Sequence, residues 1–406
     1  MFVALRKIGF VLLLRVLAAL LAFYTASFVT NTLSVYESGV FFFVSTSILM
    51  LTSFSTFGLQ NVVLKFYSQK KYEYNLVGSF YRTSFVTSCL VILMSYSFIC
   101  IEGLLFDWFA LVVLLYCSSL LQLSSLYYQA VGRLSRSILF QTILVNLLFV
   151  ACAKLIDANT LIEVFLSFLA AYVLCAMCAV GLVSFRESLC QEWLMARDLT
   201  LGKQFFYINT LSQVLMLGGA VLAKANLSNE EFAMLSVGLR ISALLNFLIV
   251  AINFVYSPKL VNMHSENKMR ALMLLNRISI LSLLCSLPVF LFLMFFSFEI
   301  LRLFGEEYVQ ASGILLVLVA GQVSVSMLGA GGQYLMLTGH EILLRNITTV
   351  SVIFSLTSAY VGSLFYGVIG AASSIAISVV FHNISIICAI YYRERFFILS
   401  PRGLFR

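Results

Sequence analysis

Twelve apolar segments, most of them about 20 residues long, follow one another along this chain of 406 residues. A helix needs roughly 20 apolar residues to cross a hydrocarbon core about 30 Å thick, so these segments are long enough to span a bilayer. They lack the alternation of barrel strands, and a backbone in lipid must satisfy its own hydrogen bonds, so helices are the expected form. The predicted spans lie near residues 8–30, 39–59, 83–101, 104–126, 137–153, 161–184, 204–223, 232–256, 278–297, 311–331, 346–366 and 368–391. The sequence therefore predicts an all-α, polytopic membrane protein.

The composition excludes a water-soluble globule. Hydrophobic residues make up 62% of the chain and charged residues 10%, with a mean hydropathy of +1.03. So few charges cannot cover the surface of a soluble protein of this length. Lipid is therefore the expected surroundings of most of the chain.

The basic residues predict the orientation, because Lys and Arg favour the cytoplasmic side of short loops. With a cytoplasmic amino terminus, 20 of the 25 Lys and Arg residues fall on the inner side. These are Arg6, Lys7, Lys65, Lys70, Lys71, Arg82, Arg133, Arg136, Arg186, Arg197, Lys203, Lys259, Lys268, Arg270, Arg277, Arg345, Arg393, Arg395, Arg402 and Arg406. Three fall outside, namely Lys154, Lys224 and Arg302. We expect both termini to be cytoplasmic, and the net charge of +8 indicates topology rather than a nucleic-acid partner.

The inner loop near residues 185–203 divides the chain into two halves of six spans each. We expect an amino-terminal six-helix lobe over 1–184, a cytoplasmic linker over 185–203, and a carboxy-terminal lobe with a short tail over 204–406. Equal halves with an even number of spans predict parallel repeats around a central cavity, as in many transporters. Similar inner turns close the fourth and tenth spans, Gln129-Ala-Val-Gly-Arg133 and Met336-Leu-Thr-Gly-His340.

Features expected of an enzyme or a metalloprotein are missing from the sequence. No extramembrane segment reaches the roughly 50 residues of a small domain, and no phosphate-binding glycine loop, HExxH or nucleophile elbow occurs. Cys175 and Cys178 share a helix face without a nearby His, so packing is favoured over metal binding. His382 is expected to make a packing hydrogen bond rather than relay protons. We therefore predict no catalytic activity, cofactor or metal.

Two arginines, Arg15 and Arg240, lie inside predicted spans. Each is about eight residues from the nearer end of its span, or roughly 12 Å deep. An arginine near the centre of a spanning helix costs about 2.5 to 3.5 kcal/mol, so it usually faces a watery cavity or a partner. The alternatives are that Arg15 extends to the inner headgroups and that Arg240 binds backbone carbonyls or Asn246. The functional hypothesis is that both arginines, from different halves, attract an anionic group in a crevice between the halves.

Several segments resemble a known family of transporters. One is Glu299-Ile-Leu-Arg-Leu-Phe-Gly-Glu-Glu-Tyr-Val-Gln-Ala-Ser312, followed by Tyr334-Leu-Met-Leu-Thr-Gly-His-Glu341. Others near the amino terminus are Arg15-Val-Leu-Ala-Ala-Leu-Leu21, Tyr36-Glu-Ser-Gly39 and Phe57-Gly-Leu-Gln60. Together they resemble Wzx-type bacterial polysaccharide flippases, which belong to the polysaccharide transport family of the multidrug/oligosaccharidyl-lipid/polysaccharide exporter (MOP) superfamily.

The resemblance implies a flippase of the bacterial inner membrane. Its substrate would be an undecaprenyl-diphosphate-linked repeat unit of O-antigen, capsule or exopolysaccharide, moved across the lipid bilayer by alternating access. We expect Arg15 and Arg240 to hold the diphosphate or acidic sugars, because Arg binds phosphate oxygens through a bidentate fork. Arg82 and Arg277, at equivalent inner ends of the third and ninth spans, would recruit the headgroup. Protons or sodium are candidate energy sources, and a polysaccharide polymerase and assembly proteins are candidate partners.

Two other functions stay open at this point. A cation-coupled multidrug exporter of the same superfamily would require deep Asp or Glu residues, whereas Asp107 and Glu163 lie near outer helix ends. A membrane glycan polymerase resembles proteins with one large outer loop, which this sequence lacks. Two deep arginines without a deep carboxylate favour an anionic cargo over both alternatives.

Overall fold

A computed structural model shows a protein built from helices. It describes residues 2–59, 76–99, 108–184, 209–246 and 266–399, together with a few isolated residues between these ranges. The described residues contain no strand. The predicted all-α membrane fold is therefore confirmed, and the predicted spans fall mostly on helix where they are described.

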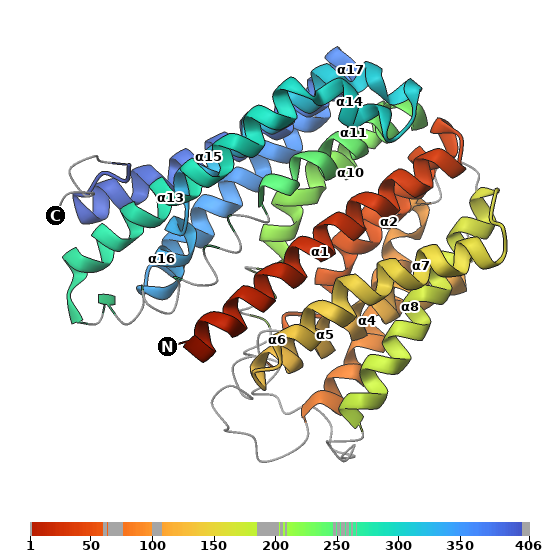
Figure 1. The fold of residues 1–406 in the computed structure, drawn as a ribbon, viewed down its shortest axis with the longest axis horizontal. Coiled ribbons are helices and arrows are strands. Elements are labelled where there is room, and N and C mark those ends of the chain that lie inside the picture. Colours follow the sequence, from red (N-terminus) through yellow and green to blue (C-terminus); the bar gives the residue numbers. More distant parts are fainter. Residues whose placement is uncertain are drawn as a thin grey trace. The chain divides into compact units, whose positions relative to one another are not determined.

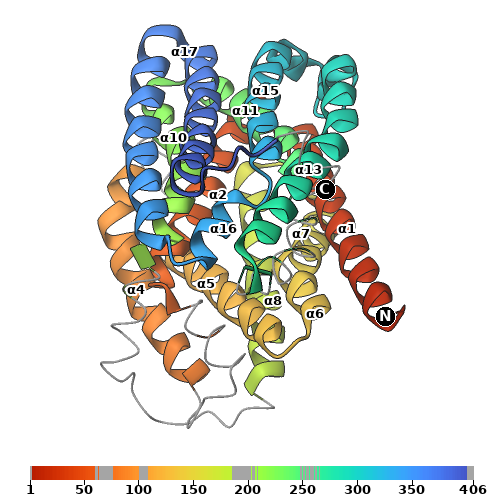
Figure 2. The same cartoon turned by 90° about the vertical axis from the view of Figure 1, so that its left-hand side faces the viewer.

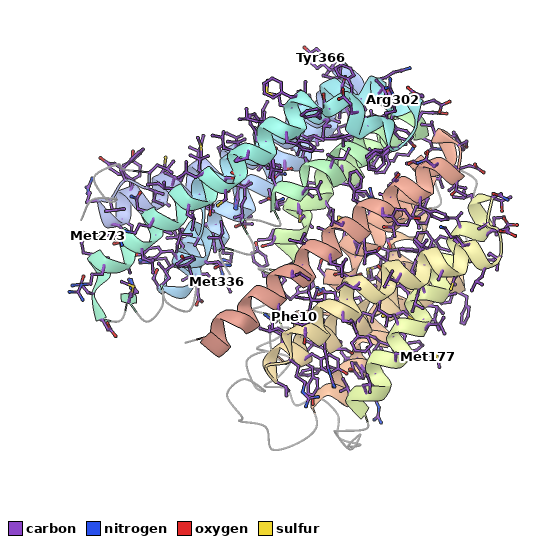
Figure 3. All side chains as sticks on the ribbon, in the orientation of Figure 1. Phe10, Met177, Met273, Arg302, Met336 and Tyr366 are labelled. Atoms are coloured by element: carbon purple, nitrogen blue, oxygen red, sulfur yellow. The ribbon has the colours of Figure 1, made fainter. Side chains whose placement is uncertain are left out.

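Eight helices within the described residues are long and apolar enough to cross a membrane. One of them, α17 (Glu341–Glu394), contains two predicted spans, because Gly367 leaves the helical conformation at φ 56° and ψ −142°. Figure 2 shows the two arms of α17 side by side, joined by the bend at Gly367. A conformation with positive φ favours Gly, which explains why the chain can reverse there.

The chain divides into two compact units (Figure 1). One, the amino-terminal unit, comprises residues 9–217, and the other, the carboxy-terminal unit, comprises 218–406 with residues 1–8. The predicted linker at 185–203 lies almost wholly outside the described residues, so the lobe boundaries stay a prediction.

The amino-terminal unit is a bundle in which α5 contacts α2, α4, α6 and α8. Its helices are α1 (Phe2–Thr32), α2 (Val35–Ser55), α4 (Leu76–Ile99), α5 (Trp108–Ala130), α6 (Leu134–Ile138), α7 (Leu144–Leu155) and α8 (Leu161–Ser184), with a π-helical turn, η1, at Leu139–Ile143 between α6 and α7. Hydroxyl groups join the central helices: Ser55 lies 2.6 Å from Ser88 and 2.8 Å from Ser119, and Thr52 lies 2.7 Å from Ser118. Small polar side chains of this kind let helices approach closely and hydrogen-bond across their interface.

The carboxy-terminal unit packs around α15 and α17. Its elements are α10 (Gly219–Ala223), η3 (Lys224–Asn226), α11 (Asn229–Ser242), α13 (Lys268–Phe295), α14 (Ser297–Arg302), η4 (Glu306–Ala311), α15 (Ser312–Leu328), α16 (Gly331–Leu337) and α17, while a π-helical turn, η2 (Val214–Gly218), spans the boundary between the units. Gly321 of α15 lies directly against Ala376 of α17, and Asn383 donates to Ser324 at 3.0 Å. Small residues thus set the spacing between α15 and α17, as they do between α2, α4 and α5.

Candidate functional site

Arg15 lies on the buried face of α1. Helical spacing places it on the same side as Ala18, Ala19 and Ala26, all of which are buried. The opposite side carries the exposed residues Leu13, Val16, Leu17, Leu20 and Tyr24. Arg15 itself is half-buried. The guanidinium group therefore leaves the helix on its protein-facing side, about 20 Å along α1 from Phe2.

Arg240 lies in α11, a helix that is buried on most of its surface. Gly238, two residues before it, packs against Leu318 and Ile314 of α15. The Nη1 atom of Arg240 donates to the Ser236 carbonyl at 3.3 Å. This bond agrees with the alternative in which Arg240 binds backbone carbonyls. The guanidinium carries five N–H donors, more than this bond uses.

Arg82 and Arg277 are both exposed; Arg82 is the seventh residue of α4 and Arg277 the tenth residue of α13. Arg82 lies in the amino-terminal unit with Arg15, and Arg277 lies in the carboxy-terminal unit with Arg240. Exposure suits a role in recruiting a headgroup. The prediction that all four arginines act on one substrate stays a prediction.

Carboxylates at helix starts serve as caps. Glu37 accepts from the Ser34 backbone N–H at 3.2 Å, and Glu231 accepts from the Ser228 N–H at 3.0 Å, each within a capping box. Glu163 accepts from the backbone N–H groups of Asn159 and Thr160 before α8. Caps of this kind satisfy N–H groups that a helix leaves free at its start. Within the described parts of the chain, Asp and Glu residues lie at helix ends or in turns.

One buried carboxylate was missed by the sequence analysis. Glu394, the last residue of α17, has a side chain that is only 1% exposed. Its Oε2 lies 2.6 Å from the Lys268 Nζ at the start of α13, and its Oε1 lies 3.6 Å from the His340 Nε2. Tyr334 of α16 is also close: burial raises the pKa of its hydroxyl, and the Glu394 carboxylate raises it further. We call Glu394, Lys268, His340 and Tyr334 the Glu394 cluster.

The tail after α17 folds back beside the Glu394 cluster. Arg395 has a left-handed conformation that ends the helix, and Ile398 is fully buried in the same hydrophobic core as Tyr334. The Leu399 N–H donates to the buried side chain of Asn276 in α13 at 2.6 Å. The tail therefore ties the end of α17 to α13.

Elsewhere, the structure shows no arrangement typical of metal binding. Among the described residues, no group of three or more His, Cys, Asp or Glu side chains could hold a metal ion. Cys175 is buried and donates to the Phe140 carbonyl at 3.1 Å, while Cys178 is exposed. The His382 Nδ1 lies 3.1 Å from the Ser351 hydroxyl, so it bridges the two arms of α17.

Several solved transporter structures are similar in fold to this chain. An inward-closed structure of the lipid II flippase MurJ superposes with a TM-score of 0.75 at 14% identity, over 96% of this chain and 88% of MurJ. An inward-facing multidrug-resistance MATE transporter of the MOP superfamily gives 0.70 at 14% identity, over 95% and 98%. A MOP superfamily transporter from Pyrococcus furiosus gives 0.60 at 13% identity, over 97% and 95%. The chain has the fold of these transporters. No protein-family model and no curated protein matches the sequence.

The fold shared with MurJ and the MATE transporters covers both units of the chain. The solved structures with this fold include a lipid flippase and drug transporters, so the fold alone does not distinguish an anionic from a cationic cargo. The choice depends on the charged side chains of this chain.

Proposed function

We propose that this protein is a flippase for a lipid-linked oligosaccharide. It moves an undecaprenyl-diphosphate-linked repeat unit of a surface polysaccharide from the cytoplasmic to the periplasmic leaflet of a bacterial inner membrane, by alternating access. Both termini are cytoplasmic in this proposal, and the lipid tail of the substrate stays in the bilayer.

Arg15 and Arg240 hold the diphosphate or acidic sugars of the substrate in this proposal. Arg binds phosphate oxygens through two parallel hydrogen bonds, which a Lys ammonium does not reproduce. Arg82 and Arg277 attract the charged headgroup at the cytoplasmic side. Their exposure permits the first contact with a substrate that arrives from the inner leaflet.

The observation that carries the proposal is the position of Arg15. It lies on the protein-facing side of α1, away from the residues that α1 exposes. A charged group on the lipid-facing side would need only to reach the headgroups, whereas one on the protein-facing side requires a polar or anionic partner. A diphosphate is an anionic group that suits this position, in addition to the contacts that Arg15 makes within the protein.

The second candidate is a cation-coupled multidrug exporter, which has the same fold. That chemistry requires a carboxylate deep in the membrane. In the described residues the carboxylates instead cap helix starts or lie at helix ends, as with Glu37, Glu231 and Glu394. The positions of the charges therefore favour an anionic cargo. A proton or sodium gradient is a candidate energy source for either function.

The test uses cells from which the gene has been deleted. We expect them to lose a surface polysaccharide and to accumulate its lipid-linked repeat unit, and we expect the intact gene to restore export. Arg15→Ala and Arg240→Ala should each fail to restore it at normal membrane abundance. Arg302→Ala is the matched control, because Arg302 is exposed and pairs with Glu306 at 2.9 Å. Unchanged surface glycan after deletion would contradict the function, and full export by both variants would contradict the site.

A further inference from the structure

Gln141 is a polar side chain exposed at membrane depth in the amino-terminal unit. It lies in the span Leu134–Leu155, seven residues from the inner end and thus roughly 10 Å deep. Apolar side chains dominate this span, which has a mean hydropathy of 2.0. A carboxamide exposed to lipid at this depth would leave its N–H donors unsatisfied, at a cost of several kcal/mol. Gln141 is therefore better suited to face water or a polar substrate.

The turn that carries Gln141 is π-helical. η1 covers Leu139–Ile143, and the Leu144 N–H bonds to the Leu139 carbonyl, which closes a turn containing one extra residue. The carbonyl of Phe140, within this wide turn, accepts from the buried Cys175 thiol at 3.1 Å. Wide turns of this type interrupt α-helices mostly at functional sites. The Cys175 thiol thus bonds to a carbonyl that the wide turn frees, so a contact from α8 stabilises this turn.

Two serines fix the orientation of the Gln141 amide. Ser125 of α5 donates to the Gln141 Oε1 at 3.0 Å, and its oxygen lies 2.7 Å from the Ser137 hydroxyl. Because Ser125 gives its only proton to Gln141, Ser137 must donate to Ser125. Both serines are buried. The amide oxygen is thus held by Ser125, whose bond uses neither of the two N–H donors of Nε2.

Gln141 and Arg15 lie at similar depths on neighbouring helices. Thr25 of α1 contacts Asn146 at 3.2 Å, and the rings of Phe28 and Phe149 lie 6.4 Å apart, so both contacts join residues 121 positions apart. A constant offset means that α1 and α7 run in the same direction. With the same offset of 121, Gln141 lies level with Leu20 of α1. Leu20 is five residues beyond Arg15, or about 7 to 8 Å along the helix axis. A diphosphate with its attached sugars can span that separation.

We propose that Gln141 is a further substrate-binding residue, which donates hydrogen bonds from its Nε2 to phosphate oxygens of the anionic headgroup that Arg15 binds. This inference rests on the proposed function and adds a neutral donor to its arginines. Ser125 and Ser137 are positioning residues, because they act on the substrate only through the amide of Gln141. The ligand class is a diphosphate, whose oxygens accept but do not donate.

The experiment compares polysaccharide export per unit of membrane protein in deletion cells carrying single variants. Gln141→Leu removes the donor, and we expect export to fall about 10-fold or more, as for a lost hydrogen bond to a charged group. Gln141→Glu keeps the acceptor for Ser125 but adds a negative charge, so we expect at least as large a loss. Ser125→Ala should give a smaller loss. Gln129→Leu, a half-buried glutamine near the end of α5, is the matched control and should export normally.

The outcomes separate substrate binding from a structural role. If Gln141 only accepts a bond from Ser125, Gln141→Glu should export normally and Ser125→Ala should be as harmful as Gln141→Leu. That pattern would overturn the inference. Normal export by Gln141→Leu would overturn it too, and so would a loss of abundance or thermal stability in the Gln141→Leu protein. Loss of export in Arg15→Ala alone would leave the proposed function standing, whereas unchanged glycan after deletion of the gene would contradict the function itself.

Discussion

Replacement of Lys268 by Met should destabilise the carboxy-terminal unit through the Glu394 cluster. The Lys268 ammonium lies 2.6 Å from a carboxylate that is 1% exposed, and Met removes this charge while keeping a side chain of similar length. Within the described residues, the remaining ion-pair partner of Glu394 would be His340 at 3.6 Å, which carries a charge only when protonated. A buried carboxylate that loses its partner must remain uncompensated or take up a proton, and both reduce stability.

The size of the effect follows from the exposure of the two partners. Breaking a fully buried ion pair costs about 3 to 5 kcal/mol, and an exposed pair contributes about 0 to 1 kcal/mol. Lys268 is 58% exposed and Glu394 is buried, so an intermediate cost of about 1 to 3 kcal/mol is expected. For a unit of roughly 200 residues, this corresponds to a fall in melting temperature of about 2 to 12 °C.

The assay is a double-mutant cycle on the full chain, purified in detergent, with melting followed by loss of the monodisperse protein on heating. Glu394→Gln removes the buried charge but keeps the shape, so Lys268→Met combined with Glu394→Gln should melt higher than Lys268→Met alone. Arg270→Met is the control, because Arg270 is an exposed cation in the first turn of the same helix. Equal melting of Lys268→Met and the wild-type protein, or no recovery in the double variant, would refute the reasoning.

Three further predictions concern packing and topology. Gly370→Ala should lower the free energy of unfolding by about 1 to 3 kcal/mol, because the added Cβ would overlap the Gly362 carbonyl on the other arm of α17. Gly313→Ala is the control and should leave the melting temperature unchanged, because nothing lies within 4 Å of its added Cβ. Ser55→Ala should lower stability by about 1 kcal/mol in the same assay, since it removes contacts to two helices; wild-type melting would contradict this. Alkaline phosphatase should be active when fused after Gly367 and inactive after Arg395, and the reverse pattern would invert the predicted topology.

The spans could be predicted from the sequence because bilayer thickness sets their length. The last two predicted spans, 346–366 and 368–391, leave only Gly367 between them, and the structure bends α17 at that residue. Glu163, which the sequence places near an outer helix end, accepts from the backbone N–H groups of Asn159 and Thr160 at the start of α8. Length, apolar composition and capping are local properties, so the sequence reports them directly.

The polar details of the interior depend on contacts between segments far apart in the chain. From the sequence, Glu394 looks like a solvated tail residue, yet its side chain is buried beside Lys268 of α13 and His340. One signal was present: Glu394 is a carboxylate flanked by Arg393 and Arg395, in a segment otherwise rich in basic residues.

The wide turn around Gln141 has no recognisable local pattern. Ser125, which fixes the Gln141 amide, comes from α5, and Cys175, which satisfies the Phe140 carbonyl, comes from α8. Neither contact follows from composition or helical spacing. Arg15 is an intermediate case, because Ala18, Ala19 and Ala26 mark a packing face once small residues are recognised as the contact surface of α1.

The central claim, that the cargo is an anionic lipid-linked oligosaccharide, is tested most directly with purified protein in lipid vesicles. The measurement is the rate at which a fluorescent undecaprenyl-diphosphate-linked oligosaccharide becomes accessible on the opposite leaflet, compared with transport of a cationic dye in the same vesicles. We expect the wild-type protein to move the lipid-linked oligosaccharide and not the dye, and Arg15→Ala and Arg240→Ala to abolish that movement. Transport of the dye without movement of the oligosaccharide would contradict the claim and establish the exporter instead.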